Sequence, residues 1–179
     1  MHYHDLTPYE YLAKSRGPLA DAAPRSLNVG WLERGHPFDT AEPSAELLAR
    51  LWALCRAPVN ATRGTHECEL CDADPLSYFV IRQGDQEIGL GHAEIWVFDG
   101  ADTVYVAPTL VYHYITAHHY CPPPQFVEAL LRCPLPESPE YDRLASQFMW
   151  GKLMLREKEF ERRFTDSDAR RDEKPFHGA

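Results

Sequence analysis

The sequence has no long hydrophobic run. No apolar stretch approaches the roughly 18 residues that a membrane-spanning helix needs, so we expect no membrane span. The start, Met1-His2-Tyr3-His4-Asp5, lacks a basic region followed by an apolar run, and no secretory signal peptide is predicted. The five cysteines are an odd number, which disfavours a disulfide framework. We therefore expect a cytoplasmic protein.

Basic residues are also scarce. The chain has 18 Lys and Arg against 27 Asp and Glu, for a net charge of -9. Proteins that bind the phosphate backbone of nucleic acids carry a basic surface, so nucleic-acid binding is disfavoured. The sequence also lacks a phosphate-binding glycine loop, a His-Glu-x-x-His helix and a nucleophile elbow. The charge fits a protein partner with a basic surface.

The composition is that of a folded protein. Of 179 residues, 44% are hydrophobic and 12% aromatic, enough for one domain with its own core. Residues 1–43 are interrupted by proline and glycine and are predicted to be an irregular arm packed on the body. Residues 44–166 are predicted to form one zinc-containing domain, and 167–179 a frayed tail.

Periodicity and turn signals predict an α+β fold, a small antiparallel sheet covered by about four helices. Ser44 is an N-cap candidate and Pro58 ends the helix that follows. Asp99-Gly100 is a hairpin signal between two strands, and Gly84-Asp85 is a second turn. The expected strands are 77–82, 94–98 and 103–106, and the expected helices are 44–57, 109–119 with Pro108 in its first turn, 124–132 and 138–164.

Residues 59–75 join the first helix to the sheet and carry His66-Glu67-Cys68-Glu69-Leu70-Cys71. Cys-x-x-Cys is the usual turn that directs two sulfurs at one Zn²⁺, and an imidazole two residues earlier supplies a third ligand. We predict a zinc site with ligands His66, Cys68, Cys71 and His113. For the fourth ligand His113 ranks ahead of His118 and His92, because it lies in the middle of a rigid helix.

Other interpretations of these residues remain open. The two cysteines could be a redox pair or buried thiols without a metal. His92-Ala93-Glu94 invites comparison with the His-x-Glu of zinc deaminases, but their Cys-x-x-Cys follows that tripeptide and here it precedes it. A broader zinc hydrolase would use Glu94 as acid or base beside an open metal.

Four motifs together resemble a family of small, uncharacterised bacterial proteins with no assigned activity. The resemblance covers roughly 29–131 and leaves the C-terminal helix outside it. It implies that the cysteine-rich turn and the His-Tyr helix belong to one unit, and it implies no reaction. In that family the position of His92 is not a histidine, which argues against a deaminase. The motifs are His66-x-Cys68-x-x-Cys71, Gly91-x-Ala93-Glu94-Ile95, Tyr105-x-Ala107-Pro108 and His113-Tyr114-x-x-x-His118-x-Tyr120-x-Pro122-Pro123.

The sequence therefore predicts a bacterial cytoplasmic protein with a structural Zn²⁺, acting as a protein-binding, immunity or accessory module. No residue is assigned a catalytic role under this hypothesis. The alternative is a zinc-dependent hydrolase or deaminase-like enzyme that uses Glu94.

Overall fold

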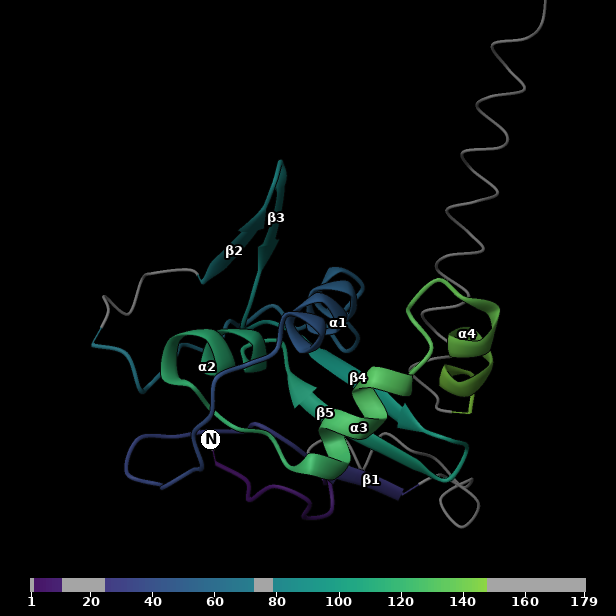
Figure 1. Cartoon of the computed structure of the whole chain (residues 1–179), viewed down its shortest axis with the longest axis horizontal. Helices are drawn as coiled ribbons and strands as arrows, with labels where there is room; N and C mark the ends of the chain where they lie inside the picture. The colour runs from purple at the N-terminus through teal and green to yellow at the C-terminus, as the bar shows by residue number, and fades with distance from the viewer. Residues whose placement is uncertain (1, 11–24, 73–78, 148–179) are drawn as a thin grey trace, which may run out of the picture.

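A computed structural model describes residues 2–10, 25–72 and 79–147 of the chain (Figure 1). It has the α+β architecture predicted from the sequence, with helices packed around small sheets. The elements in chain order are β1 (Arg25–Asn28), α1 (Ala45–Arg56), β2 (Val80–Gln83), β3 (Gln86–Gly89), β4 (Glu94–Asp99), β5 (Thr103–Pro108), α2 (Val111–His118), α3 (Pro124–Arg132) and α4 (Pro139–Ala145).

The central sheet has three strands in the order β1-β5-β4. β4 and β5 form the antiparallel hairpin predicted by Asp99-Gly100, and β1 pairs with β5 in parallel. The sheet is therefore mixed, because a strand from the N-terminal part of the chain completes it. The inner positions of β4 and β5 are almost all buried, as expected for a strand pair covered on both faces.

Helices α1 and α3 pack on this sheet and share a core with it. Ser44 accepts a hydrogen bond from the Leu47 N–H and caps α1, as the sequence predicts. In α3, Phe126 lies edge-on to Tyr105 of β5, with ring centroids 6.0 Å apart. Arg50 of α1 then donates to the last carbonyls of α3, so the two helices are joined by polar as well as apolar contacts.

The segment 2–10 is held against the body by hydrogen bonds. The Asp5 carboxylate accepts from the Tyr120 hydroxyl at 2.7 Å and from the Gly30 N–H at 2.8 Å. Tyr9 is buried, and its hydroxyl donates to Glu94 at the start of β4. These contacts connect the beginning of the chain to β4 and to the residues that follow α2.

The main differences from the sequence prediction concern Pro108, the strand β3 and the last helix. Pro108 is the last residue of β5 and not part of a helix, and α2 begins at Val111. Proline has no N–H to donate, so it is tolerated at the end of a strand as well as in the first turn of a helix. The strand β3 was not predicted, because Gln86–Gly89 is polar and short. The predicted helix 138–164 begins at Pro139, and its part beyond residue 147 lies outside the described residues.

The β2–β3 hairpin extends away from the three-stranded sheet (Figure 1). It lies between the cysteine-containing loop and β4 in the chain. Among the described residues, no helix combines the length and the hydropathy needed to cross a membrane.

Candidate metal centre

The loop that follows α1 is held by backbone hydrogen bonds before it reaches the cysteines. Val59 and Glu94 exchange two backbone hydrogen bonds, at 2.8 and 2.9 Å. The His66 N–H donates to the Gly91 carbonyl at 2.6 Å. Gly91 has φ +89°, and a Cβ there would lie 2.3 Å from the His66 oxygen, so only glycine lets the two backbones approach this closely.

Arg34 fixes the turn that carries the cysteines. Its Nε donates to the Glu69 carbonyl at 2.8 Å, and its Nη2 donates to the Cys71 carbonyl at 3.2 Å and to the Asp72 carboxylate at 2.9 Å. No local pattern indicates this role, because Arg34 lies 35 residues before Glu69 in the chain. The guanidinium holds the backbone on both sides of Leu70 and thereby fixes the position of the Cys71 backbone.

Helix α2 carries the two histidines. His113 is its third residue, in the first turn, and His118 is its last residue. His119 then adopts the left-handed conformation, with φ 56°, and its N–H donates to the Tyr114 carbonyl, which ends the helix. The His113 ring also packs on Phe79, with centroids 4.3 Å apart.

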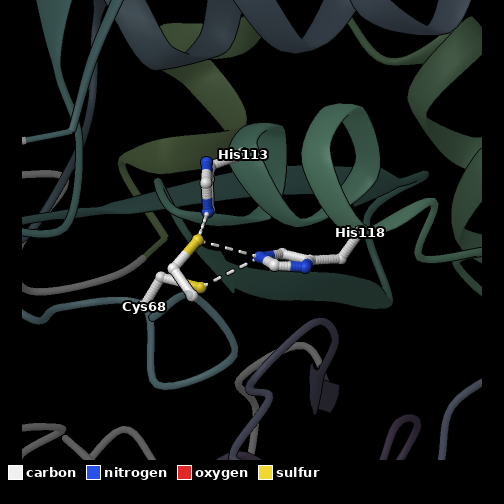
Figure 2. A group of neighbouring side chains, drawn as sticks. Cys68, His113 and His118 are labelled. Atoms are coloured by element: carbon white, nitrogen blue, oxygen red, sulfur yellow. Dashed lines mark hydrogen bonds between the residues drawn. The ribbon is translucent and has the colours of Figure 1, made fainter. Parts of the chain in front are cut away.

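Four side chains converge between the loop and α2. The Cys68 Sγ lies 3.2 Å from the His118 Nε2, and the Cys71 Sγ lies 3.2 Å from the same nitrogen and 3.3 Å from the His113 Nε2. All four ligand atoms are within 4.8 Å of one another. Figure 2 shows Cys68, His113 and His118 pointing toward a common centre.

Burial controls the protonation of this group. It lowers the pKa of His113 to about 4, with a further contribution from His118, so this imidazole is neutral at pH 7 and has a free lone pair. The pKa of His118 is lowered by the same cause. Burial raises the pKa of the Cys68 thiol to about 11 in the metal-free protein. A metal ion would have to displace that proton, as it does whenever a thiol becomes a ligand.

The donor set fits one tetrahedral metal ion. Zn–S bonds of 2.3 Å and Zn–N bonds of 2.0–2.1 Å at tetrahedral angles separate sulfur from nitrogen by about 3.6 Å. The observed separations of 3.2 and 3.3 Å are a few tenths shorter, a difference that small side-chain rotations accommodate. Two thiolates and two neutral imidazoles suit Zn²⁺ and balance its charge.

The structure brings together Cys68, Cys71 and His113 of the predicted ligand set, and the fourth member of the group is His118. His66 is not a member, and its side chain is exposed. Its backbone is bound to Gly91 ahead of the cysteine turn, and the spacing in the sequence could not reveal where the ring would point.

His113 and His118 both belong to the group of four metal-ligating side chains, although they are five positions apart in α2. We expected His118 to point to a different part of the helix surface. The two rings nevertheless lie with centroids 5.1 Å apart. His92, which ranked third for the fourth ligand, lies outside the group.

Glu94 also lies outside the group. It is 4% exposed, and its two carboxylate oxygens accept hydrogen bonds from the Tyr9 hydroxyl and, at 2.7 Å, from the Asn60 amide. Burial raises its pKa, and the two hydrogen bonds partly offset that effect. The structure thus places Glu94 in a polar contact between the N-terminal segment, the loop and β4.

The family of the chain is shown by a match over most of its length. The domain of unknown function DUF7919 matches residues 1–131. The chain belongs to this family. The matched range includes all four members of the metal-ligand group and ends just before α3 does. It also covers the N-terminal segment that contacts the body through Asp5 and Tyr9. No curated protein and no solved structure shows a significant match to the chain.

Proposed function

We propose that this chain is a zinc-stabilised protein-binding module in which Cys68, Cys71, His113 and His118 hold one Zn²⁺. The observation that carries the proposal is the convergence of these four ligand atoms within 4.8 Å. Four protein ligands fill a tetrahedral coordination sphere and leave no position for water or substrate. Such closed sites are structural, whereas catalytic zinc sites keep one position open.

The metal would connect an irregular loop to α2, a helix that is packed into the core. Residues 59–72 contain no helix or strand, and the contacts that hold them include hydrogen bonds to Glu94, His92, Gly91 and Arg34 and the burial of Val59 and Cys68. A Zn²⁺ bound to Cys68 and Cys71 would join this loop to α2. The binding free energy of a structural zinc ion then becomes free energy of folding.

A binding role suits the remaining properties of the chain. The net charge of -9 favours a partner with a basic surface, since complementary charge accelerates association. A bacterial cytoplasmic immunity or accessory protein is the setting that we propose for such a module. An enzyme would need an acid or base at an open metal position, and both oxygens of Glu94 are bonded to Tyr9 and Asn60 instead.

Metal analysis of purified variants tests the proposal. We expect one zinc per chain in the wild type and in His66→Ala, and a loss of most of the zinc in His118→Ala. Cys68→Ser should lose zinc as well, whereas Cys121→Ser, at a cysteine outside the group, should keep it. Zinc retained in His118→Ala and lost in His66→Ala would contradict the proposed ligand set.

A further inference from the structure

Within the described residues, the strand β3 pairs only with β2, and its other edge is unpaired. The Leu90 N–H donates to the Phe79 carbonyl at 2.8 Å. Phe79 and Leu90 are therefore a hydrogen-bonded pair, next to the pair of Val80 and Gly89 in the ladder. Hydrogen-bonded and non-hydrogen-bonded pairs alternate along an antiparallel ladder. Gly89 and Glu87 therefore belong to non-hydrogen-bonded pairs and direct their N–H and C=O groups away from β2. In the part of the chain that the structure describes, these backbone groups have no hydrogen-bond partner.

This edge faces a groove of about 440 Å³. One wall is the whole of β3, and the opposite wall is formed by the end of α1 and the residues after it. Of the described residues, none from β2 lines the groove, so it follows the outer edge of β3. The lining residues are Cys55, Arg56, Pro58, Gln86, Glu87, Ile88, Gly89 and His92.

We propose that this groove binds an extended segment of a partner protein, which adds to β3 as a further strand. Glu87 and Gly89 present donors and acceptors about 6.8 Å apart, the repeat of alternate residues in a strand. Strand addition takes its affinity from such main-chain hydrogen bonds and its specificity from side-chain contacts. The inference rests on the proposed protein-binding role and names the surface that would perform it.

The unpaired charge of the groove is positive. Arg56 has no ion pair within the described ranges, whereas the Glu87 carboxylate is bonded to Arg82 across the hairpin. His92 adds a ring nitrogen to the same wall region. The segment should therefore carry Asp or Glu where it passes Arg56, even though the partner's overall surface is basic.

The floor of the groove is suited to binding rather than to chemistry. The Cys55 thiol is buried and lies 3.8 Å from the Thr109 carbonyl. Burial raises its pKa to about 12, so it is uncharged and a poor nucleophile. Together with Pro58 and Ile88 it gives an apolar surface on which a side chain of the segment can pack.

Selection from a combinatorial library of ten-residue peptides on the wild-type protein tests the proposal. We expect the selected peptides to be enriched in Asp and Glu and to protect the amides of Glu87 and Gly89 from hydrogen exchange. Gly89→Pro removes one outward N–H, and a Cβ there meets only the His92 ring, at 4.0 Å. This variant should weaken binding of the selected peptides at least tenfold. Arg56→Ala should weaken the acidic peptides by a similar factor.

Val80→Pro is the matched control, because Val80 pairs with Gly89 and its N–H points to the opposite edge of the hairpin. It should leave peptide binding unchanged. Equal losses in both proline variants, or selected peptides that leave Glu87 and Gly89 unprotected, would overturn the proposal. So would self-association of the wild type that Gly89→Pro abolishes, since the edge would then bind a second copy.

Zinc content is measured on the same samples, so that the two proposals fail separately. Peptide binding at β3 in a protein that takes up no zinc would contradict the metal centre only. A protein with one tightly bound zinc from which no peptide can be selected would contradict the strand-addition groove only.

Discussion

Single residues decide how closely the metal-binding loop approaches the body. Gly91 is the clearest case, because its φ of +89° and the missing Cβ let its carbonyl accept from the His66 N–H. Arg34 then positions the turn by binding two of its carbonyls. Neither residue is a ligand, and both determine where the ligands lie.

Gly91→Ala should destabilise the protein by more than about 3 kcal/mol, because an unfavourable φ is combined with a backbone clash. Gly100→Ala is the matched control, since Gly100 has φ +66° and open space around it. It should cost only about 1 kcal/mol, the conformational term alone. Urea unfolding of both variants measures the difference. Similar costs would show that the contact with His66 does not matter.

Glu94 should make stability depend on pH. Burial raises its pKa in the folded protein above the unfolded value of 4.5, so the folded state holds the proton more tightly. The stabilising contribution of this group is complete below that value and is lost as the pH rises through the folded pKa. Relative to Glu94→Gln, the wild type should therefore lose stability as the pH rises above 4.5.

Comparing the two proteins at each pH by urea unfolding removes the effect of every other titrating group, the metal ligands included. The replacement of one acceptor oxygen by an NH2 group in the glutamine variant adds an offset that is the same at each pH. A wild-type stability that stays constant or increases relative to Glu94→Gln as the pH rises would contradict the raised pKa.

At the scale of elements, caps and turns set the boundaries that the sequence could predict. Ser44 and Ser138 accept hydrogen bonds from N–H groups three residues later, and the start of α1 was predicted from Ser44 as an N-cap. The helix 124–132 was predicted to the residue, because prolines precede it and one face is apolar. β3 was missed, because a short polar strand at an open edge has no periodic pattern.

Arg50 connects two of these elements. Its guanidinium donates to the carbonyls of Leu130, Leu131 and Cys133 at the end of α3. Arg50→Ala should cost about 2–4 kcal/mol, because buried carbonyls at a helix end lose a charged donor. Arg143→Ala, at an exposed position in the last turn of α4, should change stability by less than about 0.5 kcal/mol. Thermal unfolding of both variants measures the two losses of stability. Equal losses would show that the hydrogen bonds from Arg50 to the end of α3 contribute little to stability.

At the scale of the whole molecule, long-range packing decided what the sequence could not. The Cys-x-x-Cys turn and the importance of His113 could be inferred from spacing and from a rigid helix. The choice between His66 and His118 could not, because it depends on how the loop lies against Gly91 and α2. The parallel pairing of β1 with β5 was also beyond local patterns, since about 75 residues separate the two strands.

Metal removal should affect the stability of the whole domain. Zinc binds the folded state and joins the loop to α2, so a strong chelator should lower the melting temperature by at least about 10 °C. Re-addition of Zn²⁺ should restore it. The Cys68→Ser variant serves as the control, because it should melt at the lower temperature with or without chelator. An unchanged melting temperature in the wild type would show that no structural metal is present.

X-ray absorption at the zinc edge of the purified protein tests the central claim most directly. We predict two sulfur ligands at about 2.3 Å and two nitrogen ligands at about 2.0–2.1 Å, with no oxygen in the first shell. A shell with one sulfur, or with a water oxygen in place of an imidazole nitrogen, would contradict the closed centre formed by Cys68, Cys71, His113 and His118.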